Sequence, residues 1–496
     1  VVGGFTLEAA QAVAGDGGDA DWAVVDRLSA LVAQSLVRRA DGLDGEPRFA
    51  MLETIREFGV ERLAEGGEEE ATRRAHADWV IAFFEAAWSA IIARFESEEL
   101  ARVNAERDNL RSALGWLETA GDAEGWVRLA GAADPFWNYL SSRFEGRAWL
   151  ERALDHTRGA AVSADVRIRA LLSAGYLARN QGDYPRAIAC GQECLELALA
   201  ANHQARAATS HHLLGYVASA EGKYEQASVH FEEALRLGEV LGDRGEVTGA
   251  WLELGRVAYG RGDYEQAAAV LEQTLAELRD LDDRWSLALT LSSLGLVEGL
   301  RSQRQSAADR LLEAGSLWQA FANKENQTEW LAIVATLAAS GQALQIAARL
   351  LGAAEAVRAE IGHAFVFPDA RYFAEAEQTA RKMLGETAFQ AHHDAGRALT
   401  LDQAAAEATA FLSGSPQTPI AATPHHASAS APDHGLTRRE CEILDLLCQR
   451  WTNSEIADRL YLSERTVETH VHNVLGKLGA ENRREAAAIA ARLALV

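Results

Sequence analysis

The chain has 496 residues, of which 48% are hydrophobic and 24% are charged. These values are typical of globular proteins and exclude global disorder and collagen, while the length allows about three to five domains or one long repeat array. The 72 acidic residues outnumber the 48 basic ones and give a net charge of −24. This argues against a broad nucleic-acid-coating surface, but not against a small DNA-reading module at one end. No uncharged run approaches the ~18 apolar residues of a membrane helix and no signal peptide opens the chain, so we expect a cytoplasmic protein without a membrane partner.

The first 65 residues predict a helix, a β-hairpin and a second helix. An apolar helical pattern covers 22–32, two short strands over 35–39 and 48–52 flank a glycine-containing turn, and a helix follows over 53–63. This order is that of the end of a winged helix. We therefore assign 1–65 as a winged-helix-like remnant.

Two strings in this remnant resemble a known class of regulator. Residues 51–58, Met-Leu-Glu-Thr-Ile-Arg-Glu-Phe, resemble the segment that follows the nucleotide-binding core in STAND-type ATPase regulators, and 3–10 resemble its start. Together with Val1 in place of a starting Met, the resemblance implies a Walker-type ATPase upstream, and we expect ATP to bind only there. This chain contains no GxxxxGK[ST] motif, no Ser/His/Asp set and no metal-ligand spacing. We expect no cofactor, no metal and no enzymatic activity in it.

A repeat with a period of 40 residues follows a helical connecting region at 66–162, in which 97–157 predict one helical pair. Each repeat predicts two amphipathic helices around a Gly-Asp-Tyr-like turn, with small residues where the paired helices approach. Since one unit cannot bury its apolar face alone, we expect five units over 163–362 to stack into a solenoid, the last one degenerate. The register is carried by Gly175, Gly215, Gly255 and Gly295, by Ala187, Ala227, Ala267, Ala307 and Ala347, and by turns that begin at Gly182, Gly222 and Gly262.

The third unit resembles the tetratricopeptide repeat in Leu254-Gly255, Gly262-Asp263-Tyr264, Ala267 and Leu271, although that family's usual period is ~34. The fourth unit departs, with Ser302 at the turn where Gly is expected. The resemblance implies a superhelical solenoid whose concave face binds an unknown effector or protein partner. Residues 363–412 predict capping helices, one of them with Thr400 as its N-cap.

The composition of residues 413–435 predicts a flexible linker. They hold half of the eight prolines among Ser, Ala and Thr, a composition that cannot bury a core. The linker separates the body from a tail at 436–496, in which nine basic side chains balance nine acidic ones. The whole net charge therefore lies on the body and the linker.

The tail predicts four helices. Two short helices around a three-residue turn, the second longer and polar on its outer side, describe a helix-turn-helix. The third helix carries one buried stripe, made of Val467, Val471, Val474, Leu475 and Leu478. The predicted N-caps are Thr437 for 438–449, Thr452 or Asn453 for 454–460 and Ser463 for 464–478, and Asn482 starts the fourth helix.

Four strings, at 436–440, 453–457, 462–471 and 477–479, resemble the LuxR-type DNA-binding domain, and the likeness covers 433–496 nearly end to end. The resemblance implies that the third helix enters the major groove of double-stranded promoter DNA and that the fourth forms a homodimer contact. By position, Glu468, Thr469 and His472 would face base edges. Asn453, Ser463, Arg465, Thr466, His470, Asn473, Lys477 and Arg483 would lie near phosphates.

The sequence departs from that family at two positions. Arg450 replaces the usual Gly, and Glu468 stands where a basic residue is frequent. A carboxylate can accept from cytosine N4 but repels phosphate, so the operator cannot be copied from relatives.

Exposed Arg and His on a helix usually belong only to a solvated face. Here the caps, the turn, the stripe and the motif coincide, which favours DNA binding. We therefore predict an all-α protein, in which a tetratricopeptide-like superhelical solenoid follows a winged-helix remnant and precedes a four-helix LuxR-type helix-turn-helix domain. Its function would be that of a DNA-binding transcriptional regulator of the large ATP-dependent, STAND-like LuxR kind. The alternative is a protein-interaction scaffold with a vestigial tail.

Overall fold

The computed structural model divides the chain into two compact units, Val1–Ala421 and Ala422–Val496. In the first unit it describes 3–414 except 16–20, 43–44, 95–96, 141–142, 282, 322 and 362–368. In the second it describes 443–444, 446–448, 451–453, 456, 467, 471, 474, 480 and 483. None of the described helices is both long and apolar enough to cross a membrane.

The N-terminal part contains the expected helix, hairpin and helix. Its elements are α1 (Leu7–Ala14), α2 (Asp21–Ala33), β1 (Val37–Asp41), β2 (Pro47–Met51) and α3 (Glu53–Gly66). The strands pair antiparallel with Val37 opposite Met51, and an isolated bridge joins Phe5 to Phe49. Helix α1 was not predicted. It begins after Thr6, whose hydroxyl accepts a hydrogen bond from the Ala9 amide and so caps the first turn.

The connecting region is more divided than the sequence suggested. It consists of α4 (Glu69–Arg94), α5 (Ser97–Ala105), α6 (Arg107–Ala120), α7 (Ala123–Ala132), a π-helical turn η2 (Phe136–Leu140) and α8 (Arg143–His156). The prediction of one helical pair over 97–157 is therefore wrong. One cause is that Gly121, with φ of +71°, ends α6 and the Asp122 carboxylate at once caps α7.

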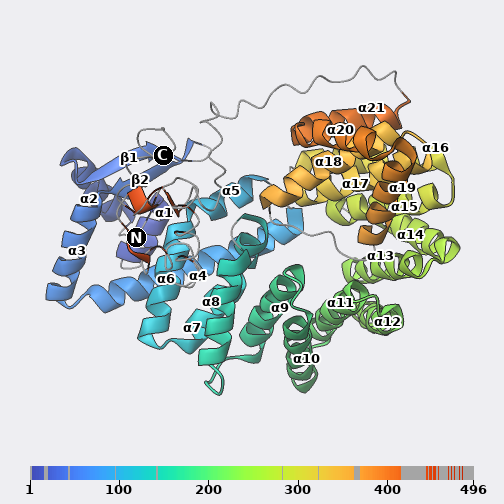
Figure 1. The fold of residues 1–496 in the computed structure, drawn as a ribbon. Helices are drawn as coiled ribbons and strands as arrows, with labels where there is room; N and C mark the ends of the chain where they lie inside the picture. Colours follow the sequence, from blue (N-terminus) through green and yellow to red (C-terminus); the bar gives the residue numbers. More distant parts are fainter. Residues whose placement is uncertain are drawn as a thin grey trace. The chain divides into compact units, whose positions relative to one another are not determined.

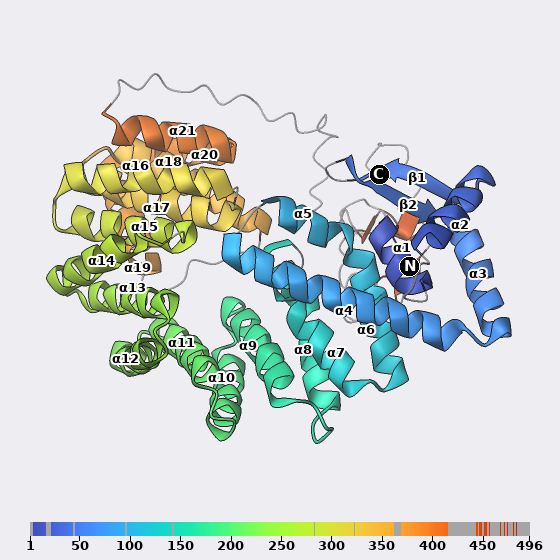
Figure 2. The same ribbon diagram turned by 180° about the vertical axis from the view of Figure 1, so that it is seen from behind.

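Five helical pairs form the solenoid (Figure 1). They are α9 (Ala164–Asn180) with α10 (Tyr184–Ala200), α11 (Gln204–Ala220) with α12 (Tyr224–Leu241), α13 (Arg244–Arg261) with α14 (Tyr264–Leu278), α15 (Arg284–Leu300) with α16 (Arg304–Phe321), and α17 (Lys324–Ser340) with α18 (Leu344–Ile361). In both views α9, α11 and α13 lie on the inside of the curve and α10, α12 and α14 on the outside (Figures 1 and 2). We call the side of the first helices the inner face.

The turn inside each pair requires one residue with a left-handed backbone conformation. Gly182, Gly222 and Gly262 all have positive φ there, which costs glycine little. Ser302 and Gln342 occupy the same place in the last two units and keep the conformation, with φ of 64° and 62°. The turn geometry therefore persists where the glycine signal is lost.

The recurring small residues lie where helices meet, as predicted. A Cβ added to Gly255 would lie 2.7 Å from Cγ of Leu271, and one added to Gly295 would lie 2.5 Å from Cγ of Leu311. Ala267 is fully buried. Only a hydrogen side chain allows this approach between α13 and α14.

Three helices cover the end of the solenoid: α19 (Asp369–Leu384), α20 (Glu386–Arg397) and α21 (Leu401–Leu412). Thr400 caps α21 as expected and forms a capping box with Gln403. Helix α19 reaches back to α13, where the Tyr372 hydroxyl donates to the backbone oxygen of Tyr259 at 2.7 Å.

Candidate nucleic-acid interface

A small apolar core defines the tail. The predicted stripe of the third helix contributes Val467, Val471 and Val474, which are all buried. They pack with residues of the first two predicted helices, namely Ile443, Leu444, Leu446, Leu447 and Ile456. The stripe is therefore confirmed at these three positions, while Leu475 and Leu478 lie outside the described residues.

The start of the second predicted helix is also described. The Ile456 amide donates to the backbone oxygen of Thr452 at 2.9 Å, and Asn453 already has helical conformation. Of the two N-cap candidates, this places Thr452 at the cap position.

Two of the predicted phosphate-contacting residues bind each other. The Arg483 guanidinium donates to Oδ1 of Asn453 and, at 3.4 Å, to the backbone oxygen of Trp451. Both residues are partly buried. Arg483 therefore ties its own segment to the beginning of the second helix, a positioning contact that sequence spacing did not reveal.

The other predicted site residues lie outside the described part of the tail, so their orientation stays a prediction. They are Ser463, Arg465, Thr466, Glu468, Thr469, His470, His472, Asn473 and Lys477.

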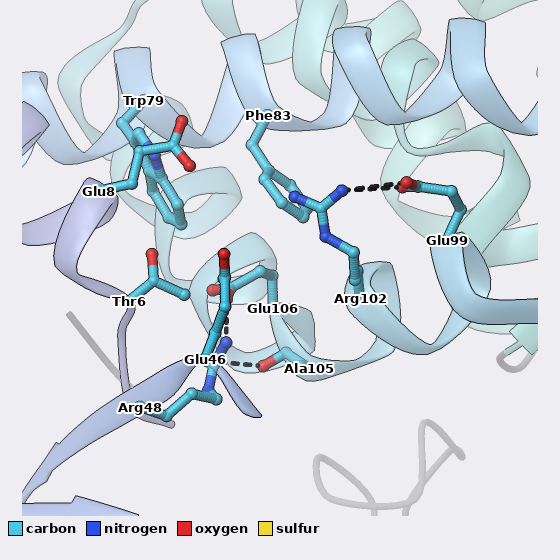
Figure 3. Close-up of a pocket in the computed structure, with 10 residues that line it drawn as sticks. All are labelled: Thr6, Glu8, Glu46, Arg48, Trp79, Phe83, Glu99, Arg102, Ala105 and Glu106. Atoms are coloured by element: carbon cyan, nitrogen blue, oxygen red, sulfur yellow. Dashed lines mark hydrogen bonds and ion pairs between the residues drawn. The ribbon is translucent and has the colours of Figure 1, made fainter. Parts of the chain in front are cut away.

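The body contains a cavity of about 360 Å³ where the hairpin meets α4–α6 (Figure 3). Trp79 and Phe83 point into it from α4. Arg48 pairs there with Glu106 and also donates to the Ala105 carbonyl at 3.2 Å, which leaves no uncompensated charge on this arginine. The cavity thus lies in a joint between the winged helix and the helical region.

The same joint holds a buried histidine. His76 lies 3.3 Å from Oδ1 of Asn109, whose amide donates to the Gly4 carbonyl at 3.0 Å. Burial lowers the pKa of His76 to about 4. Among the described residues, no group of three or more His, Cys, Asp or Glu side chains is arranged as a metal site.

Three separate parts of the chain match the profiles of known families. The winged helix-turn-helix domain profile matches residues 1–64, and tetratricopeptide repeat profiles match 166–239 and 218–291. The profile described as bacterial regulatory proteins, luxR family, matches 434–490. This match contains the whole apolar core of the tail.

The spore germination protein GerE of Bacillus subtilis is 47% identical over 51 residues, which are 10% of this chain and 69% of that protein. The chain belongs to the LuxR family of bacterial regulatory proteins. The fold class predicted from the sequence, with tetratricopeptide repeats before a LuxR-type domain, is confirmed.

Two further relatives are longer than the spore germination protein. A protein of Mycobacterium tuberculosis named as an HTH-type transcriptional regulator is 37% identical over 173 residues, which are 34% of this chain and 19% of that protein. The DNA-binding transcriptional activator DevR/DosR of the same species is 40% identical over 99 residues, or 20% of this chain and 41% of the activator. The match to the first of these spans about a fifth of its length.

Among solved structures, a STAND protein with a tetratricopeptide repeat sensor from Pyrococcus horikoshii aligns with this chain. The alignment covers 79% of this chain and 63% of that protein's chain. The TM-score is 0.42 and the identity 13%, a likeness too low to bear on function.

Proposed function

We propose that this chain is a cytoplasmic, DNA-binding transcriptional regulator. Its LuxR-type tail would read promoter DNA as a homodimer, and its solenoid would sense an effector or protein partner. The observation that carries the proposal is the buried core of the tail, which falls inside the stretch matched by the LuxR profile. The names of the relatives as transcriptional regulators support it. We place any ATP binding outside this chain.

Within the tail, we assign base reading to Glu468, Thr469 and His472. Lys477 and the remaining predicted residues would contact phosphates, which supply affinity but no sequence information. For Arg483 and Asn453 the contact between them adds a second role, because it ties the start of the second helix to position 483. A helix that must enter the major groove depends on such positioning.

The decisive experiment is selection of bound sites from random double-stranded DNA with the whole 496-residue protein. We expect one enriched sequence with two half-sites, as a symmetric dimer requires. Thr469→Ala should change the selected sequence, whereas Lys477→Ala should weaken binding to all sequences. Lys382→Ala, which removes an exposed lysine of α19 in the body, is the matched control.

The scaffold alternative makes the opposite prediction. If the folded protein enriches no sequence, and Lys477→Ala behaves like Lys382→Ala, the tail is vestigial and the proposal is wrong.

A further inference from the structure

Two helices of the inner face carry the same pair of side chains in reversed order. In the 40-residue register, position 176 corresponds to 256 and position 179 to 259. Helix α9 has Tyr176 and Arg179 at these places, and α13 has Arg256 and Tyr259. Residues three apart are neighbours on one side of a helix, so each helix presents an arginine beside a tyrosine.

The pair on α13 binds a carboxylate from within the chain. Nη2 of Arg256 lies 2.8 Å from Oδ2 of Asp369, and the hydroxyl of Tyr259 donates to Oδ1 of the same residue. Asp369 is the first residue of α19 and is only 8% exposed. Hydrogen bonds between a guanidinium and a carboxylate are among the strong ones in proteins. This part of the inner face is therefore built to hold an acidic side chain of a peptide segment.

The same segment makes further contacts with α13. The Tyr372 hydroxyl donates to the backbone oxygen of Tyr259, and Arg371 donates to that of Gly260 at 3.4 Å. Asp369 thus provides acceptors for the arginine and the tyrosine of α13, and Tyr372 donates a hydrogen bond to the backbone near the end of the same helix.

The pair on α9 has no such occupant among the described residues. Nη1 of Arg179 donates to Oδ1 of Asn180 at 3.0 Å, while its Nε is buried without a hydrogen-bond partner. The guanidinium lies 5.3 Å above the ring of Tyr216 on α11, and that ring lies 6.1 Å from the ring of Tyr176. Buried donors normally find an acceptor, so this arginine lacks what Arg256 has.

Polar groups next to this pair are already engaged with each other. The Asp134 carboxylate accepts from Ser173 at 2.6 Å and from Asn138 at 2.9 Å. The Asn138 amide oxygen in turn accepts from Asn180 at 3.4 Å. Asp134 is thus used by neutral donors. The carboxylates of Glu253 and Glu246 act on Tyr216 and Tyr176, but none of the described carboxylates forms an ion pair with Arg179.

We propose that Arg179, with Tyr176 and Tyr216, binds a carboxylate of an acidic peptide on the inner face of α9 and α11. The proposal rests on the proposed function, because it names the chemistry of the partner that the solenoid senses. The α13 site supplies the precedent: an acidic side chain on the arginine, with an aromatic residue packed beside it. A small organic acid offers the same carboxylate without the aromatic residue.

The test uses the whole protein and a fluorescein-labelled peptide with the sequence Asp-Ala-Arg-Tyr-Phe-Ala, which repeats 369–374. Fluorescence anisotropy should show saturable binding that weakens with salt. The peptide with Asn in place of Asp should bind about tenfold more weakly or worse, the size expected for one charge-assisted hydrogen bond. Succinate, which represents a small organic acid, should compete only weakly with the peptide.

Arg179→Gln should lower the affinity by a similar factor, and Arg179→Lys should restore part of it by keeping the charge. Arg304→Gln, which changes an exposed solenoid arginine that donates to the Ser340 carbonyl, is the matched control. The melting temperature of each variant monitors folding.

Three results would overturn the proposal: no binding of the peptide by the wild-type chain, equal binding of the Asn peptide, or binding that Arg179→Gln leaves unchanged. Strong binding of succinate without binding of the peptide would also reject an acidic peptide as the partner. DNA binding is measured on the same variants. A wild-type protein that binds DNA but not the peptide would refute this site alone. A wild-type protein that binds no DNA would refute the proposed function.

Discussion

Replacing Gly255 by Ala tests the packing that builds the repeat. The added Cβ would lie 2.7 Å from Cγ and 2.8 Å from Cδ2 of Leu271, whereas carbon atoms pack best at about 3.5–4.0 Å. Leu271 is fully buried, and its branch point cannot swing into solvent. The overlap must therefore push α13 and α14 apart or force Leu271 from its rotamer.

The magnitude follows from two opposing effects. Overpacking of a core costs about 1–3 kcal/mol, while replacing Gly by Ala inside a helix returns about 1 kcal/mol. Gly115 of α6 is the matched control, because an added Cβ there would meet no atom within 4 Å. Gly115→Ala should stabilise by about 1 kcal/mol, so the two variants should differ by about 1–3 kcal/mol.

Urea unfolding followed by far-ultraviolet circular dichroism measures this difference. A double-mutant cycle with Leu271→Ala sharpens it. That change alone should cost about 2–5 kcal/mol, but it vacates the space that the new Cβ needs, so Gly255→Ala should then cost little. Equal stabilisation by Gly255→Ala and Gly115→Ala, or an unchanged cost in the Leu271→Ala background, would refute the packing argument.

Three further predictions can be tested on the same protein. Ala267→Leu should destabilise the solenoid by about 1–3 kcal/mol by overpacking a fully buried position, and an unchanged urea midpoint would contradict this. Because burial lowers the pKa of His76 to about 4, the unfolded chain takes up a proton first as the pH falls. Protonation of His76 therefore does not lower the free energy of unfolding above about pH 6.5, and should lower it by up to about 3 kcal/mol as the pH falls toward 4. His76→Gln should flatten that part of the pH–stability curve, and an identical slope in both proteins would show that His76 is accessible. Lys477→Ala should reduce the salt dependence of DNA binding by about one unit of slope, and an unaltered slope would remove Lys477 from the phosphate contacts.

The tail carries no net charge that could attract DNA. Nine basic and nine acidic side chains leave the tail neutral, so affinity for DNA has to come from the placement of a few cations rather than from net charge. Arg483 illustrates the difference between sequence and structure here. Position in the motif suggests a phosphate contact, whereas the fold shows it bound to Asn453 and to the Trp451 carbonyl.

The sequence alone determined the features that repeat at short range. Helix periodicity, the turn glycines and the buried valine stripe are local patterns, because an amphipathic helix must bury one side and a left-handed turn favours glycine. The positions of Gly255, Ala267 and Val467 could therefore be predicted one by one. Even Ser302, where the glycine is lost, could be placed, since the period of 40 fixed its register.

Only the tertiary structure decided which distant side chains meet. Asp369 lies on Arg256, 113 residues away, and Arg143 of α8 pairs with Glu325 of α17 across 182 residues. No periodicity encodes such contacts, because a helical pattern specifies which side is buried but not what buries it. For that reason the sequence indicated an inner face that binds a partner. The fold was needed to distinguish the arginine that holds a carboxylate from Arg179, whose Nε is buried and finds no acceptor among the residues that the structure describes.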